Sequence, residues 1–346
     1  MFTVIHNVLI VKLILIHVAL VRSVKNTVKQ FIHVIQKDMM NKFLFYLFAF
    51  IVYLSFSSQL IAERIKYTSY TPEGFVEIFS GDFKSNPVEL SGELVLPKGE
   101  GPFPVVILQH GTADIKRHKK WMKNLKISLL EENIGVFIND SYKNRKIKGS
   151  DLTLAPRVID GLFSLQAVAD HPLVDSNRIG IQGYSYGGMV AFFTAYQELA
   201  DIVDAKYAAH MPVYPGCDVV INHMQMTGAP IKMIIAELDD YAPAQDCIDY
   251  GPTIGEIVIY EGLHHSFVFE GLKFHNDIGH FRNCEIGYIQ PDGNWYFNGK
   301  SRSGSEQKVL MEVWKECGDF GVHTGGRKAD QERLIDDTIS FFLKNL

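Results

Sequence analysis

A serine flanked by glycines, Ser185 between Gly183 and Gly187, is the first group in this chain that could do chemistry. A strand-like apolar run at 178–181 precedes it, and a helix-like run at 189–193 follows it. In that context the Gly-x-Ser-x-Gly pattern predicts a nucleophile elbow, a sharp strand-to-helix turn that leaves the serine hydroxyl exposed. Small residues are needed on both sides because larger side chains would collide in the turn. We therefore predict that Ser185 is a catalytic nucleophile; a plain tight turn is the alternative.

A serine hydroxyl needs a base, and the base needs an acid that orients it, in the chain order serine, acid, histidine for this kind of elbow. Asp239 follows a buried-strand pattern at 231–236, and His265 follows another at 256–260. Parallel strands bring their carboxyl ends to one edge of a sheet. Both side chains are therefore expected to meet Ser185 at that edge.

In the predicted mechanism His265 takes the proton of Ser185 while the hydroxyl oxygen attacks a carbonyl carbon. Asp239 holds the tautomer of the imidazole and stabilises its cation, and water then hydrolyses the acyl-enzyme. Asp240 is the rival for the acid and His264 the rival for the base, because each is the immediate neighbour of the preferred residue.

The oxyanion of the tetrahedral intermediate needs hydrogen-bond donors. We expect one to be the backbone N–H of Tyr186 and the other to lie in the loop after the apolar run 105–111, at Thr112 or Ala113. Aromatic residues near the predicted site could shape an apolar acyl pocket, and Tyr184 is the substrate-binding candidate among them.

Several segments, taken in order, resemble the dienelactone hydrolase family of the α/β-hydrolase superfamily. They are the runs 101–111, 139–145 and 175–180, the Ser185 elbow, and the motifs at 239–243 and 265–267. The resemblance covers about residues 70–270 plus a C-terminal helix. It implies a hydrolase of carboxylic esters or lactones that uses no metal and no cofactor, with Ser185, Asp239 and His265 as its triad. Dienelactone hydrolases proper use a cysteine nucleophile, so the serine favours an esterase-like branch of the family.

The fold that must position these groups is an α/β-hydrolase fold with about eight strands, mostly parallel and flanked by helices. The first two strands are expected to form a hairpin. Apolar stripes predict helices through 121–129, 157–170 and 330–345. Strand patterns occur at 74–80, 88–96, 104–109, 133–139, 178–183, 206–211, 231–236 and 256–260.

The segment after His265, about 270–328, is rich in Gly, Asn and aromatic residues and predicts a loop-rich insert beside the catalytic edge. It could be a lid or a binding wall, or a peripheral decoration. Four cysteines, an even number, predict two disulfides in an oxidising compartment. Adjacent strands would bring two of their loops together, so we pair Cys217 with Cys247 and Cys284 with Cys317.

The N-terminal region predicts export. A cationic start at residues 40–42, an apolar run at 43–56 and a small, polar tail that ends at Ala62 predict a signal peptide over about 40–62. An apolar run of about 14 residues is short for a membrane span. The expected product is a secreted or periplasmic protein, and an uncleaved membrane anchor is the alternative.

A second apolar stretch at 4–21 lies upstream. We hypothesise that translation begins at Met39 or Met40 and that residues 1–38 are a spurious extension, which peptides from 1–38 in a mass spectrum would refute. The alternative is a membrane helix at 4–21. The chain is thus divided into an export region, 1–62, and a hydrolase domain, 63–346.

The charge composition argues against one class of binding partner, nucleic acid. The chain of 346 residues has a formal net charge of −5, and residues 63–346 carry 28 basic and 38 acidic residues, a net charge of −10. Nucleic acid is therefore not an expected partner. The basic run 143–148 is expected to be a solvated loop. The histidines at 264, 265, 275 and 280 with Asp277 match no metal-binding spacing.

Three functions remain open on this sequence. A serine esterase that acts on a small ester or lactone is preferred. A secreted serine peptidase with the same triad and a non-catalytic binding protein on the same fold are the alternatives.

Overall fold

The computed structural model describes residues 20, 22–30, 32–33, 35–46, 60–113, 115–147, 149–250 and 255–346. The chain divides into two compact units, Met1–Gln59 and Leu60–Leu346. In the first unit the described residues are helical. No helix among the residues described here is both long enough and apolar enough to cross a membrane. Residues 47–56 of the apolar run of the predicted signal peptide and nearly all of the alternative helix at 4–21 lie outside the described residues.

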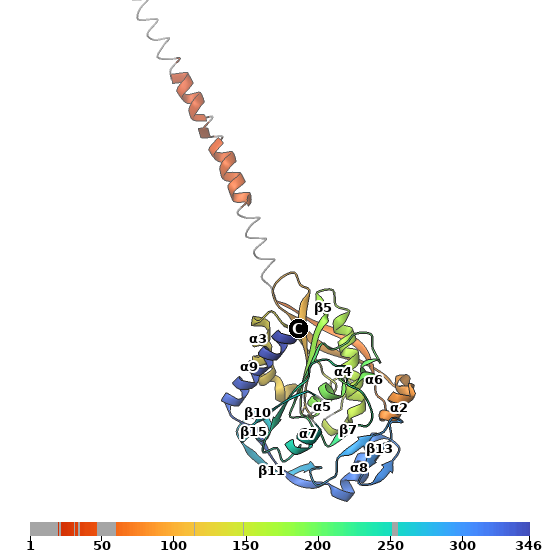
Figure 1. Ribbon diagram of the computed structural model, residues 1–346. Helices are drawn as coiled ribbons and strands as arrows, with labels where there is room; N and C mark the ends of the chain where they lie inside the picture. The colour runs from red at the N-terminus through yellow and green to blue at the C-terminus, as the bar shows by residue number, and fades with distance from the viewer. Residues whose placement is uncertain are drawn as a thin grey trace, which may run out of the picture. The chain divides into compact units, whose positions relative to one another are not determined.

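The second unit is built on an eight-stranded sheet in the order β1-β2-β4-β3-β5-β6-β8-β9 (Figure 1). Strands β1, β2 and β4 pair antiparallel, and the strands from β4 to β9 in that order pair parallel. This is the expected mostly parallel α/β-hydrolase sheet. The strands are β1 (Ile61–Tyr70), β2 (Pro87–Leu96), β3 (Phe103–Gln109), β4 (Gly135–Ile138), β5 (Val174–Tyr184), β6 (Ala209–Val213), β8 (Lys232–Ala236) and β9 (Glu256–Tyr260).

Helices cover both faces of this sheet because the strand residues alternate between two cores. In β3, Val106 and Leu108 pack into the core beneath α3 (Ile115–Glu131) and α9 (Lys328–Asn345), which lie side by side (Figure 1). Val105 and Ile107 pack into the opposite core, under α4 (Leu154–Ala169) and α5 (Tyr186–Phe193). Period-two alternation in one strand thus serves two helical layers. Short helices α2 (Phe75–Ser80), α6 (Gln197–Ala200) and α7 (Ala244–Tyr250) complete the unit.

The strand predicted at 74–80 is wrong, because this segment is helix α2. The edge hairpin is made instead by β1 and β2, which pair from Ile61 with Leu96 to Tyr70 with Pro87. Strand β1 was missed because its sequence is mostly polar, as its exposed edge position allows. It begins at Ile61, next to the predicted cleavage site.

The segment 270–328 is not loop-rich as predicted, since strands and a helix account for much of it. Strands β10 (His265–Glu270), β15 (Asp319–Gly326) and β11 (Lys273–His280) form one small sheet. A second sheet adds β14 (Lys300–Arg302), β13 (Trp295–Phe297) and β12 (Gly287–Ile289) to β7 (Val219–Ile221). Helix α8 (Glu306–Cys317) packs with them. We call this whole segment the insert.

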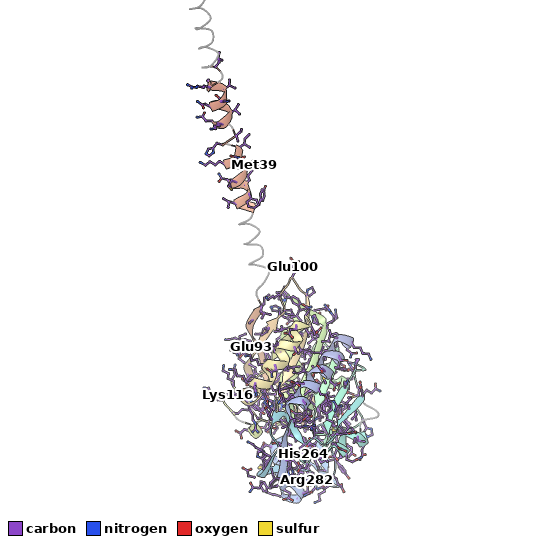
Figure 2. The ribbon with its side chains drawn as sticks, turned by 90° about the vertical axis from the view of Figure 1, so that its left-hand side faces the viewer. Met39, Glu93, Glu100, Lys116, His264 and Arg282 are labelled. Carbon is purple, nitrogen blue, oxygen red and sulfur yellow. A yellow bond between two sulfur atoms is a disulfide. The ribbon has the colours of Figure 1, made fainter. Side chains whose placement is uncertain are left out.

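Both disulfides have the predicted pairing, Cys217 with Cys247 and Cys284 with Cys317. The second lies wholly within the insert and joins the loop before β12 to the end of α8. His264 and Arg282 lie at the opposite end of this unit from Glu100, which precedes β3 (Figure 2). The insert therefore stands at the edge where the parallel strands end, which is where sites form in open α/β sheets.

Candidate active site

Ser185 sits on a sharp turn between β5 and α5, with φ 54° and ψ −119°. This left-handed conformation is costly for a residue other than glycine. The turn is so tight that a Cβ on Gly183 would lie 1.8 Å from the carbonyl oxygen of Gly187. A Cβ on Gly187 would lie 2.4 Å from the carbonyl oxygen of Gln109. Both glycines are therefore required by close backbone approach, and the geometry is that of the predicted elbow.

Three side chains from three strand ends form a hydrogen-bonded relay. Ser185 Oγ lies 2.8 Å from His265 Nε2, and His265 Nδ1 lies 2.7 Å from Asp239 Oδ2. The other carboxylate oxygen of Asp239 accepts hydrogen bonds from the backbone N–H groups of Tyr241, at 3.0 Å, and Ala242, at 2.8 Å. His265 is 3% exposed and Asp239 is 7% exposed. A nearly buried carboxylate held by two N–H donors can orient the imidazole without turning away from it.

Two tyrosine rings enclose the imidazole of His265. The ring centroid of Tyr241 lies 4.7 Å from it, and that of Tyr214 lies 5.0 Å from it. Burial raises the pKa of both tyrosines, so their hydroxyls stay neutral at physiological pH. The rings therefore fix the imidazole by packing and add no charge beside it.

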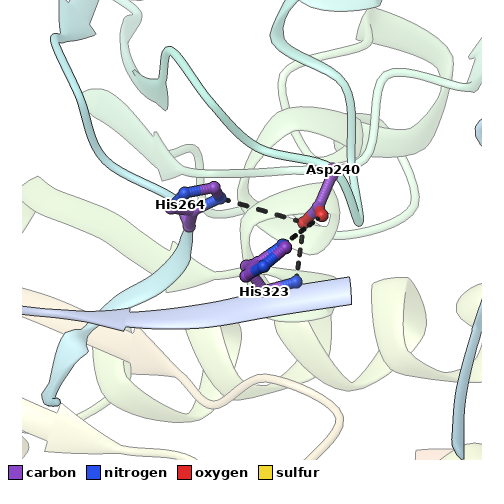
Figure 3. Close-up of side chains that lie close together, drawn as sticks. All are labelled: Asp240, His264 and His323. Atoms are coloured by element: carbon purple, nitrogen blue, oxygen red, sulfur yellow. Dashed lines mark hydrogen bonds and ion pairs between the residues drawn. The ribbon is translucent and has the colours of Figure 1, made fainter. Parts of the chain in front are cut away.

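The two rival residues, Asp240 and His264, lie close to His323 (Figure 3). Asp240 accepts hydrogen bonds from the backbone N–H of His323, at 2.8 Å, and from its Nδ1, at 2.7 Å. Arg282 donates to the carbonyl oxygen of Asp240 at 2.7 Å. Burial would raise the pKa of Asp240, but the hydrogen bonds from His323 outweigh it and leave that pKa lowered. Asp240 thus ties the loop that carries Asp239 to β15 of the insert.

Asp240, His264 and His323 are also the residues best placed to hold a metal ion in the described part of the chain. Their possible ligand atoms all lie within 4.8 Å of one another. One carboxylate and two imidazoles is a donor set that zinc accepts. However, Arg282 Nη1 lies 3.6 Å from Asp240 Oδ2, where its positive charge would oppose a cation. We interpret the group as a hydrogen-bonded pair of Asp240 and His323, with His264 Nδ1 4.0 Å from the Asp240 carboxylate. His275, His280 and Asp277 do not belong to it.

The loop expected to supply the second oxyanion donor lies against the elbow. A Cβ on Gly111 would be 3.5 Å from the Cβ of Ser185. Thr112 lines both cavities that adjoin Ser185, and Tyr186 lines one of them. The two backbone N–H groups remain predictions, with Ala113 as the alternative.

Arg157 of α4 is a functional residue that sequence reasoning missed. It is completely buried and donates hydrogen bonds to the carbonyl oxygens of His110 and Gly111. Its guanidinium carbon lies 5.1 Å from the ring centroid of Tyr186. Arg157 therefore holds the loop after β3 close to Tyr186, the residue that follows Ser185. The available signal was an arginine at the start of the apolar stripe 157–170, where a charge is costly unless it has partners.

Tyr184 does not line either cavity at Ser185, which corrects the prediction that it binds substrate. Its side chain is fully buried in the core beneath α3, with ring centroids 6.1 Å from Trp121 and 6.2 Å from Tyr214. The reason is strand alternation, since the last residue of β5 points into the core on the α3 side.

The basic run 143–148 is not simply a solvated loop. Arg145 is almost buried and contacts both carboxylate oxygens of the fully buried Asp160, at 2.6 Å and 2.8 Å. This bidentate pair anchors the loop to α4. Arg145 is therefore a structural residue.

Comparisons with known proteins found a matching family model and several similar proteins. The family model described as "Dienelactone hydrolase family" matches residues 90–279. "Protein usf" of Aquifex pyrophilus is 21% identical over 206 residues, which cover 55% of this chain and 86% of that protein. "Esterase EstD" of Thermotoga maritima is 26% identical over 180 residues, which cover 49% of this chain but only 42% of that protein. Among solved structures, esterase Pf2001 of Pyrococcus furiosus aligns with a TM-score of 0.45 and 18% identity, over 60% of this chain and 85% of that one.

Proposed function

This chain belongs to the dienelactone hydrolase family of α/β-hydrolases, and from that premise we propose that it is a serine hydrolase of carboxylic esters or lactones. The observation that carries the proposal is the relay from Ser185 Oγ through His265 to Asp239. Its distances are those of a nucleophile and its base within hydrogen-bond reach, with the base oriented by a third group. Similarity to EstD, which is named an esterase, supports the same class of activity.

In the proposed reaction, His265 Nε2 accepts the Ser185 proton as Oγ bonds to the carbonyl carbon of the ester. The backbone N–H groups of Tyr186 and Thr112 stabilise the resulting oxyanion. His265 then gives the proton to the leaving oxygen, the acyl group stays on Ser185, and a water molecule repeats the sequence to release the acid. Asp239 stabilises the imidazolium through its hydrogen bond to Nδ1.

Fluorophosphonate labelling of the purified protein tests this proposal. We expect labelling of the wild type, loss of labelling in Ser185→Ala, and retention in Ser176→Ala, which removes an exposed serine from the same strand. A wild type that is not labelled would support the binding protein. Paired 4-nitrophenyl esters and 4-nitroanilides then separate the esterase from the peptidase, because they differ in the atom that leaves.

The two disulfides support a second proposal, that the protein acts in a secreted or periplasmic compartment. An N-terminal mass that begins near Glu63 in exported protein would support cleavage of the predicted signal peptide. Peptides from residues 40–62 in the mature protein would contradict it.

A further inference from the structure

A cavity of about 200 Å³ opens beside Ser185, and the insert supplies much of its wall. Phe281, Trp295, Phe297 and Leu310 come from the insert, and Met189 comes from α5. Aromatic walls around a cavity of this volume leave room for a compact, ring-sized group. The insert therefore forms part of the wall of this cavity.

Two polar side chains in this wall have no side-chain hydrogen-bond partner within the described part of the chain. His280, at the end of β11, is 1% exposed, and neither ring nitrogen makes a hydrogen bond of normal geometry within the described residues. Asp218, before β7, is partly buried, and among the described residues its carboxyl bonds to its own backbone. A Cβ on Gly216 would lie 2.6 Å from Asp218 Oδ1, so glycine at position 216 leaves space for the carboxyl group of Asp218. Polar groups in such places are normally paired, so both side chains keep hydrogen-bonding capacity for a ligand.

The charges of this cavity select against anions. Asp218 is acidic, and no Lys or Arg occurs among the described residues that line it. Burial raises the pKa of Asp218 to about 6, so it is mostly ionised at neutral pH. Burial also lowers the pKa of His280, so its imidazole is neutral there and offers one donor and one acceptor. An uncharged group that can donate and accept hydrogen bonds fits these partners.

A second cavity, of about 280 Å³, also adjoins Ser185, and the residues that line the two cavities indicate which part of an ester each one holds. His265 lines only this second cavity, whereas Tyr186 lines only the first. The base must give its proton to the leaving oxygen, so the alcohol part belongs on the His265 side. The acyl part then belongs in the first cavity, next to a predicted oxyanion donor.

We propose that the first cavity is an acyl subsite for esters of compact, uncharged carboxylic acids that carry a hydroxyl group, which Asp218 and His280 bind. This inference rests on the proposed ester hydrolysis and adds its substrate class. The hydroxyl donates to the Asp218 carboxylate or accepts from the His280 ring, and an acyl group with its own carboxylate is repelled. Specificity thus comes from hydrogen bonds to the hydroxyl group of the preferred acyl part and from charge repulsion of an acyl carboxylate.

Three ethyl esters test the proposal, those of 3-phenylpropanoic acid and its 4-hydroxy and 4-carboxy derivatives. For the wild type we expect kcat/KM for the hydroxy ester to exceed that of the unsubstituted ester about tenfold, because unpaired polar groups penalise the latter. The carboxy ester should be the poorest substrate. In His280→Phe the hydroxy preference should fall to about twofold or less, and Asp218→Asn should relax the rejection of the carboxy ester.

His275→Phe is the matched control, since it makes the same change on the same strand outside this cavity, and it should keep the wild-type ratios. Fluorophosphonate labelling shows whether each variant retains a folded site. A wild type that hydrolyses all three esters equally well would overturn the subsite while leaving ester hydrolysis intact. The subsite would also be overturned if His280→Phe and Asp218→Asn are labelled but keep the wild-type ratios of kcat/KM. A wild type that hydrolyses none of them and is not labelled would remove both proposals.

Discussion

Glu306, the first residue of α8, should make this protein less stable as the pH rises. It is 1% exposed, and its carboxylate oxygens accept hydrogen bonds from the N–H groups of Leu154, at 2.9 Å, and Ala155, at 3.0 Å. These are the first two residues of α4, and helix N-terminal donors favour the ionised form. Burial favours the neutral acid instead. Burial prevails and raises the pKa of Glu306 from 4.5 to about 7.

The size of the effect follows from this shift. Between pH 4.5 and 7 the folded protein keeps a proton at Glu306 that the unfolded chain has released, so the free energy of unfolding falls as the pH rises. A shift of this size corresponds to about 3 kcal/mol over the whole titration, of which about 2.5 kcal/mol falls between pH 5 and pH 8. Glu306→Gln imitates the neutral acid. We expect it to match the wild type at pH 5 and to be about 2–3 kcal/mol more stable at pH 8.

Urea unfolding with the disulfides intact, followed by tryptophan fluorescence at pH 5 and pH 8, measures this difference. At each pH, the free energy of unfolding of the wild type is subtracted from that of the variant. The change in this difference between pH 5 and pH 8 is free of the contributions of all other titrating groups, because they are common to both proteins. Glu332→Gln, which removes an exposed carboxylate from α9, is the control and should change stability by less than about 0.5 kcal/mol. If Glu306→Gln is less stable than the wild type at pH 8, the two N–H donors outweigh burial and the reasoning is refuted.

Two further changes test the site and the insert. Asp239→Asn should lower kcat for ester hydrolysis about 10⁴-fold without unfolding the protein, because the amide favours the wrong tautomer of the His265 imidazole. A loss of kcat below tenfold, with an unchanged melting temperature, would contradict the role of Asp239 in orienting that imidazole. Replacement of both Cys284 and Cys317 by Ala should lower the free energy of unfolding by about 4 kcal/mol, given their sequence separation of 33. Urea curves that coincide with those of the wild type would show that the insert does not depend on this link.

The central sheet and the relay could be predicted because their signals are local. Buried parallel strands are short apolar runs, and β3, β5, β8 and β9 all had that pattern. Strand β1 had none, because an edge strand with a solvent-exposed face can be mostly polar. Segment 75–80 has an apolar composition that suits a strand, yet it forms α2. Its buried residues Phe75 and Ile78 are three apart, which suits one face of a helix.

The roles of partners far apart in the sequence could not be predicted. Nothing near Arg157 shows that its guanidinium supports the carbonyl groups of His110 and Gly111. Arg145 looked like part of a solvated basic loop until Asp160 was found buried against it. Such pairs exist only after the chain has folded, because a buried charge must find its partner wherever the backbone brings one.

The order of Ser185, Asp239 and His265 along the chain, each after a strand pattern, was enough to predict which three groups meet, since parallel strands end at one edge. The shape and polarity of the cavity beside them are different, because they depend on how the insert packs. His280 and Trp295 come from the insert, Asp218 comes from the loop before β7, and Glu306 begins α8. Only tertiary structure places these side chains around one cavity, because none of their contacts is encoded in a local pattern.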